Sequence, residues 1–371
     1  MSTDLGASFN EQYMNINTKM KKRFMRKPNV SEATNEFIAL AIQCEHSDQP
    51  AFAGHAYVGA AKCEASVGHF LGEAEHFLAA ARQFMKAEKK LKSLKFYSAD
   101  RENLEAAIGC YIQALNKYPE KSPIRTSILM ELASDLVELN HKMEAAAYYE
   151  QALETVTEST MKTICLKNLL SLRIDSGKYD MALEIANKMV DGLNANVPED
   201  VLAEVQVSRI LLTLLVKPPE DSKPPSLKQL FIDLMNDNES DTIPLNTDLK
   251  LKLQSIIICH ATGDTQALIS VSADTKQFLT LQQVELLHKL ISDERGTFLY
   301  FDLISEVSSR VNDRLALLGV GPHLLKHIHL IFIFLISTLV TFSRLHLIRL
   351  VPAVLKWIAD VPVVIRCNLK A

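Results

Sequence analysis

Three stretches of the chain share one spacing of small and larger apolar residues: EAAIGCYIQAL at 105–115, EAAAYYEQALE at 144–154 and MALEIANKMV at 181–190. The shared positions are i, i+4 and i+7, which lie on one face of an α-helix. Small side chains on that face let a neighbouring helix approach closely. The spacing therefore predicts that eight residues pack helices together: Ala107, Tyr111, Ala114, Ala145, Tyr149, Ala152, Ala182 and Ala186.

The first alanines of the three stretches, Ala107, Ala145 and Ala182, lie 38 and 37 residues apart. A weaker copy begins at Ala74, 33 residues before Ala107. Intervals of this length are typical of helix-turn-helix repeats. Such units bury their apolar faces only by stacking on one another. The sequence therefore predicts an all-α fold of stacked helical hairpins, a tetratricopeptide-like α-solenoid.

Composition agrees with this fold class. The 371 residues are 48% hydrophobic, enough for a substantial core, and include only 12 Gly and 13 Pro. So few turn residues favour long elements. The six cysteines form no CxxC pair, and the amino end has no signal-peptide pattern, so we expect reduced thiols in an intracellular protein.

Charge is unevenly distributed along the chain. Residues 1–27 and 297–371 each carry a net charge of +4, whereas residues 28–296 carry −12. An acidic body repels polyanions, so nucleic acid is not an expected partner.

A cluster of cations lies near the amino end, in KKRFMRKPNV at 21–30. Six residues of it are candidate partner contacts: Lys21, Lys22, Arg23, Phe24, Arg26 and Lys27. The cluster suits an acidic groove, a membrane surface or nuclear import, although for an arbitrary protein a solvated basic arm is the favoured interpretation. We predict a disordered basic arm at 1–28, a helical-repeat domain at 29–295 and an atypical extension at 296–371.

Several signals predict where helices begin and end. A helix is expected from about 30 to 46, a helix pair at 50–69 and 71–96, and an apolar helix at 204–216. Turns are expected at Asn140-His141 and at Ser176-Gly177. Three capping signals mark helix starts: Asn29 with Glu32, Ser122 before Pro123, and Thr280 with Gln283.

Three stretches carry a family resemblance: KKRFMRKPNV at 21–30, EVQVSRILLTLLVKPP at 204–219 and TLQQVELLHKL at 280–290. In sequence and order they resemble the family of the huntingtin-associated protein of forty kilodaltons, the factor VIII intron 22 protein. The resemblance covers residues 19–295. It implies a tetratricopeptide-like fold similar to the vesicle-fusion attachment proteins, without enzymatic activity.

The resemblance also implies a partner and a location. Family members bind huntingtin by lodging between its amino- and carboxy-terminal HEAT-repeat regions. They are linked to an early-endosomal Rab GTPase and to endosome motility. We therefore expect a cytoplasmic, early-endosome-associated protein, and the basic cluster also suits the nucleus.

The chain departs from the family pattern after about residue 295, where some 75 further residues follow. They contain an expected hydrophobic helix at 324–350, in which residues 327–343 lack any Lys, Arg, Asp or Glu. A membrane span needs about 17 to 25 such residues. Three interpretations compete: a membrane anchor, a buried or partner-covered helix, and a non-native tail. We favour the last, because the resemblance assigns nothing to this segment.

No motif predicts catalysis. The sequence lacks a GxxxxGK phosphate loop, a GxSxG elbow and an HExxH zinc motif. We therefore predict no catalytic residues, no metal and no cofactor. Two functions compete: a wedge held between the arms of huntingtin, and a general vesicle-traffic adaptor that binds peptides or a Rab GTPase. The wedge is expected to be unstable alone, whereas the adaptor is expected to be a stable monomer.

Overall fold

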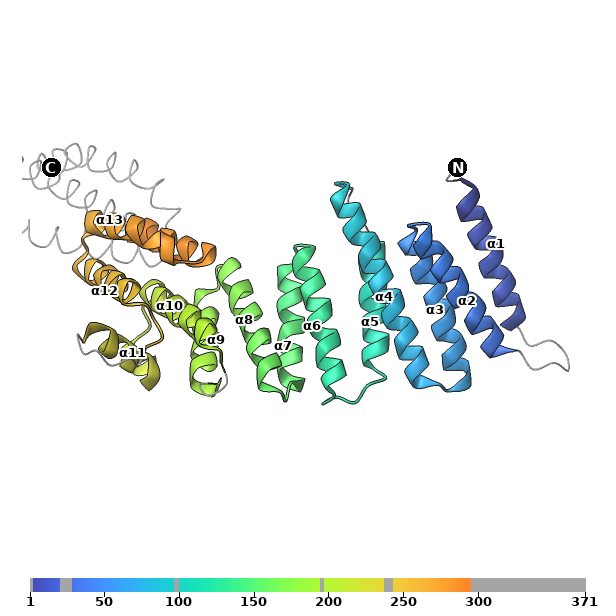
Figure 1. The fold of residues 1–371 in the computed structure, drawn as a ribbon, viewed down its shortest axis with the longest axis horizontal. Helices are drawn as coiled ribbons and strands as arrows, with labels where there is room; N and C mark the ends of the chain where they lie inside the picture. The colour runs from blue at the N-terminus through green and yellow to red at the C-terminus, as the bar shows by residue number, and fades with distance from the viewer. Residues whose placement is uncertain (1–2, 21–28, 97–99, 194–196, 237–242, 295–371) are drawn as a thin grey trace, which may run out of the picture. The chain divides into compact units, whose positions relative to one another are not determined.

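The computed structural model of the chain describes residues 3–20, 29–96, 100–193, 197–236 and 243–294. Within these ranges the regular elements are helices, and none is a strand (Figure 1). The all-α fold class is confirmed. From α1 to α10 each helix packs against the next one in the sequence, and successive helices run in opposite directions. The result is a stack of helical hairpins.

The chain divides into two compact units. The first comprises Met1–Ile257 and Val271–Leu287, and the second comprises Ile258–Ser270 and His288–Ala371. The stack of hairpins belongs to the first unit. In the described part of the second unit, the imidazole Nδ1 of His260 lies 3.2 Å from a carboxylate oxygen of Glu294.

The helices of the stack have the following bounds: α1 Thr3–Met20, α2 Val30–His46, α3 Pro50–Val67, α4 Phe70–Ser93, α5 Glu102–Leu115, α6 Pro123–Glu138, α7 Lys142–Thr155, α8 Ser159–Asp175, α9 Tyr179–Leu193 and α10 Glu199–Val216. After them come the 3-10 turn η1 Glu220–Ser222, α11 Pro225–Met235, α12 Thr247–Thr262, α13 Thr265–Thr275, η2 Lys276–Phe278 and a helix at 281–294. The helix pair expected at 50–69 and 71–96 is confirmed.

Tight turns join the hairpins. Gly68 and Gly177 adopt positive φ angles of 77° and 70°, and Asn140 adopts 69°. A left-handed residue of this kind commonly ends a helix, and Gly and Asn tolerate it best. The turns expected at Asn140-His141 and Ser176-Gly177 are confirmed.

Two of the three capping predictions are confirmed. The Asn29 side chain accepts a hydrogen bond from the Glu32 amide at 3.3 Å. The backbone N–H of Thr280 donates to Gln283 Oε1 at 3.0 Å, and Thr280 Oγ1 accepts from the Gln283 amide at 3.4 Å. The third prediction is wrong in one respect. Helix α6 begins at Pro123, but Ser122 makes no side-chain cap, because proline alone suffices to set the first helical turn.

The Ala74 copy of the repeat needs a correction. Ala107, Ala145 and Ala182 lie in α5, α7 and α9, so they mark alternate helices and a true repeat. Ala74 lies in α4, directly before α5, so the interval of 33 residues joins consecutive helices. The 24-residue length of α4 makes this interval resemble a repeat.

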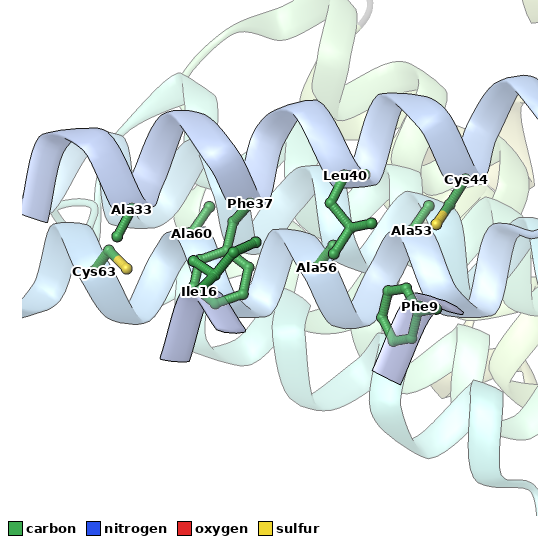
Figure 2. Close-up of a cluster of buried hydrophobic side chains, with 11 residues drawn as sticks. Phe9, Ile16, Ala33, Phe37, Leu40, Cys44, Ala53, Ala56, Ala60 and Cys63 are labelled. Atoms are coloured by element: carbon green, nitrogen blue, oxygen red, sulfur yellow. The ribbon is translucent and has the colours of Figure 1, made fainter. Parts of the chain in front are cut away.

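The disorder predicted for the amino end is wrong for α1. Figure 2 shows Phe9 and Ile16 of α1 beside Phe37 and Leu40 of α2, and all four are buried. The polar composition of residues 1–17 hides the helical spacing of Phe9, Ile16 and the partly buried Tyr13. Residues 21–28 and 295–371 lie outside the described residues, and so do the expected hydrophobic helix at 324–350 and its uncharged segment.

Candidate partner-binding surfaces

The eight residues predicted to pack helices are all buried, between 0% and 3% exposed. They lie on α5, α7 and α9, on the faces turned toward neighbouring helices. They are therefore part of the core and unavailable to a partner. The surface that remains is formed by charged and scattered apolar side chains.

The basic cluster connects two helices that pack on each other. Its six candidate contacts, Lys21 to Lys27, lie outside the described residues. On one side α1 ends at Met20, and on the other α2 begins at Val30. Lys19, at the end of α1, pairs with Glu36 of α2. The helices on either side of the segment are therefore joined by an ion pair, and the predicted partner contacts of the segment itself stay a prediction.

A polar link joins each odd-numbered helix to the next even-numbered one, from α5 onward. The Tyr111 hydroxyl of α5 donates to Glu131 of α6 at 3.0 Å. The Tyr149 hydroxyl of α7 accepts from Asn168 of α8 at 3.1 Å. In the third copy of the repeat, on α9, Ala186 occupies the position of the tyrosine. There Asn187 of α9 accepts from Arg209 of α10 at 2.6 Å.

Arg209 is fully buried, and its hydrogen-bond acceptors among the described residues are all neutral. Besides Asn187, its guanidinium donates to Gln206 Oε1 at 3.5 Å and to the hydroxyl of Ser226 on α11. Burial lowers the pKa of Arg209 to about 10, because the charged form loses its hydration, and Asp191 offsets part of this effect. Arg209 fastens α9, α10 and α11 together. Its only sequence signal is a single cation inside an apolar helix, which sequence reasoning passed over.

Ion pairs join α4 and α6 at the surface. Arg82 of α4 donates to both carboxylate oxygens of Glu131, at 2.7 and 2.9 Å. Lys89 lies 2.8 Å from Asp135 and 2.6 Å from Glu138. The acidic side chains of α6 neutralise these cations of α4, so α4 is a poor binding site for polyanions.

Ionisation at this surface follows from the same contacts. Burial alone would raise the pKa of Glu131, but hydrogen bonds from Arg82 and Tyr111 outweigh burial and the pKa is lowered. Burial raises the pKa of Tyr111, and the charges of Glu131 and Asp135 raise it further. Tyr111 therefore stays a neutral donor to two carboxylates.

The helix at 281–294 begins on the surface of α8 and α10. Gln282 Nε2 donates to the Ser171 carbonyl at 2.9 Å and to Asp175 at 2.7 Å. Gln283 Nε2, on a 3% exposed side chain, donates to the Glu204 carbonyl at 2.9 Å. These two glutamines therefore attach the start of this helix to α8 and α10.

A hollow of about 170 Å³ lies among α7, α8 and α9. Leu166 and Leu169 of α8 are buried in its lining, and Met181 of α9 is 41% exposed. Exposed Glu150, Glu184 and Lys188 also line it. Glu150 pairs with the buried Arg173 of α8. The lining of the hollow therefore combines buried apolar side chains with exposed charged ones.

Metal clusters and membrane-spanning helices are both absent from the described ranges. No three His, Cys, Asp or Glu side chains there gather closely enough to hold a metal ion. Nor does any helix in those ranges have the length and apolar character needed to cross a membrane.

Comparison with known proteins confirms the resemblance. No family model matches the chain. Proteins named 40-kDa huntingtin-associated protein, from Mus musculus and Rattus norvegicus, are each 24% identical to it, over 77% of this chain and 92% of theirs. The chain resembles the 40-kDa huntingtin-associated protein. A solved structure titled "Functional Characterization of Pseudomonas Aeruginosa pilF" aligns with 70% of this chain and 99% of its own, at 16% identity and a TM-score of 0.31.

Proposed function

We propose that this chain is a non-enzymatic binding partner of huntingtin, held as a wedge between the HEAT-repeat arms of that protein. The observation that carries the proposal is the similarity to two 40-kDa huntingtin-associated proteins over 92% of their length. Stacked hairpins suit this role, because helical repeats offer extended surfaces to large partners.

The uneven charge distribution along the chain supports contact with two different surfaces of the partner. Residues 28–296 carry a net charge of −12, whereas residues 1–27 carry +4. A body and a segment of opposite sign orient the chain between two regions of one large partner, since charge complementarity sets orientation more than affinity. Binding then restrains the arms and stabilises the wedge by mass action.

The direct test is purification of the full chain from its own cells under mild conditions. We expect huntingtin among the co-purified proteins in near-equal amount, identified by mass spectrometry. A recovered chain without huntingtin, or with huntingtin at trace level only, contradicts the proposal. Peptides from residues 296–371 in the same sample show whether the extension is present in the protein.

A second test addresses the basic segment. Reversing the charge of Lys21, Lys22, Arg23, Arg26 and Lys27 is expected to weaken co-purification at physiological salt. The matched control reverses five exposed lysines that form no ion pair within the described ranges: Lys62, Lys86, Lys121, Lys162 and Lys228. Both variants change the net charge equally. Equal recovery from the two removes the basic segment from the mechanism.

The hollow among α7, α8 and α9 favours one alternative, a vesicle-traffic adaptor that binds short peptides or an early-endosomal Rab GTPase. Stability of the chain alone separates the two functions. A wedge is expected to aggregate or to unfold easily without its partner, whereas an adaptor remains a stable monomer in size-exclusion chromatography. Fluorescence microscopy with early-endosome markers tests the location that both functions share.

A further inference from the structure

The junction between α5 and α6 differs from the other junctions of the stack. Among consecutive helices from α1 to α10, these two share the fewest close backbone approaches, and α3 and α4 share the most. The connection at 116–122 is also longer than the turns at Gly68 and Gly177. Backbone packing therefore contributes least to cohesion at this point.

Tyr111 of α5 and Arg125 of α6 connect the two helices, and Arg125 donates to the Leu115 carbonyl of α5 at 2.6 Å. Tyr111 is 0% exposed, and its hydroxyl lies 3.0 Å from Glu131 Oε1 and 3.3 Å from Asp135 Oδ2. The hydroxyl contacts two acceptors, so rotation of α6 exchanges one hydrogen bond for the other.

Ion pairs between α4 and α6 span the same junction at the surface. Arg82 and Lys89 of α4 bind Glu131, Asp135 and Glu138 of α6 across the surface. The Arg82 side chain is 57% exposed and that of Lys89 is 31% exposed. Ion pairs this accessible are worth at most about 1 kcal/mol each and are screened by salt. Long, flexible side chains also keep contact while the helices tilt.

We propose that the α5–α6 junction is the hinge of the helical stack, at which α1–α5 and α6–α10 bend as two blocks. The ionic network sets the stiffness of the hinge, so salt loosens it and a charged partner surface can select its angle. The hinge follows from contacts inside the chain and stands whether or not the partner is huntingtin.

The test measures distances across and within the blocks in the full chain. Spin labels on unnatural side chains at positions 62 and 162, on α3 and α8, report across the junction. Pairs at 62 and 113, and at 151 and 188, report within the two blocks. All five positions are exposed. Pulsed electron resonance then gives the width of each distance distribution.

We expect the 62–162 distribution to broaden between about 0.05 M and about 1 M salt, where the Debye length falls to about 3 Å. The two pairs within blocks are expected to keep their widths. Glu131→Gln with Asp135→Asn is expected to give the broad distribution already at low salt. Lys90→Gln, which removes an ion pair to Asp48 inside the first block, is the matched control and should change nothing.

Two outcomes overturn the hinge. One is a 62–162 width that salt and the double variant leave unchanged, and the other is equal broadening of all three pairs. Circular dichroism verifies that the double variant is folded. If it is not, Arg82→Gln provides the same comparison, because it removes one exposed partner of Glu131 and leaves Tyr111 in place.

Discussion

The helices α2, α3 and α4 meet through glycine and phenylalanine, whereas α6 meets α4 and α5 through ion pairs and a tyrosine. A Cβ on Gly59 would lie 2.8 Å from the Phe37 ring, and one on Gly54 would lie 2.9 Å from the Phe84 ring. Each ring therefore occupies the place of a missing side chain. Both phenylalanines are nearly fully buried, so they have no room to move away.

The comparison separates two properties that a helical repeat needs. Interlocked apolar side chains give a stiff block, because close-packed interiors resist deformation. Exposed ion pairs and one hydroxyl give an adjustable contact, because water and salt compete for the same groups. The predictions below test whether the two regions differ in this way, starting with the largest expected effect.

Gly59→Val should destabilise the stiff block by about 3 kcal/mol, because added carbons meet the Phe37 ring inside a packed core. The matched control is Gly109→Val on α5, where an added Cβ meets no atom within 4 Å. The control should be neutral or slightly stabilising, because glycine is a poor helix former. Urea unfolding of the full chain measures both, and equal midpoints would show that α3 is not interlocked.

Tyr111→Phe should destabilise the junction by about 1 to 2 kcal/mol, because a hydrogen bond to a charged group is lost from a buried side chain. Tyr149→Phe, at the same repeat position in α7, loses a bond to a neutral amide and should cost less. Urea unfolding of the two variants gives the order. A larger loss for Tyr149→Phe would contradict the importance of the carboxylates.

Part of this architecture can be predicted from the sequence and part cannot. Helical spacing is local, so Ala145, Tyr149 and Ala152 indicate a helix and its packing face without knowledge of the partner helix. The contacts of Tyr111 depend on residues 20 and 24 positions away, whose register is set only when α5 and α6 pack. The fit of Gly59 to Phe37 likewise requires the approach of two helices.

The burial of Phe9 and the contacts of Arg209 show what the sequence alone does not predict. Phe9 lies in a polar stretch whose composition favours disorder, and its burial depends on the apolar face of α2 and α3. Arg209 looks like an isolated cation until Asn187 and Ser226 come within reach of it. Contacts of the basic segment at 21–27 remain a prediction.

Salt should reveal the difference between the regions in stability as well as in distance. The free energy by which Glu131→Gln destabilises the chain should fall from about 1 kcal/mol at low salt toward zero at high salt. The cost of Gly59→Val should be the same at both ionic strengths, since no charge is involved. A salt-independent cost for Glu131→Gln would indicate that the network is shielded from solvent.

Acid gives the smallest expected effect. The folded chain lowers the pKa of Glu131 below its ordinary 4.5, so this carboxyl stabilises the fold at pH values above 4.5. The contribution is lost as the pH falls through the folded pKa. The stability difference between the native chain and Glu131→Gln should therefore shrink in acid. The exposed Glu154→Gln serves as the control. A stability difference between the native chain and Glu131→Gln that grows in acid would contradict a lowered pKa of Glu131 in the folded chain.

Gln282 and Gln283 attach the carboxyl-terminal end of the described residues to α8 and α10, in the middle of the chain. Their amides donate additional hydrogen bonds to the helical carbonyls of Ser171 and Glu204, which lie more than seventy positions earlier in the sequence. A truncation just before Thr280 would remove these hydrogen bonds and would expose the apolar side chains now covered by Leu286 and Leu287, which are themselves buried. Removal of the residues from Thr280 onward is therefore expected to destabilise α8 and α10, although both helices lie far from the truncation point in the sequence.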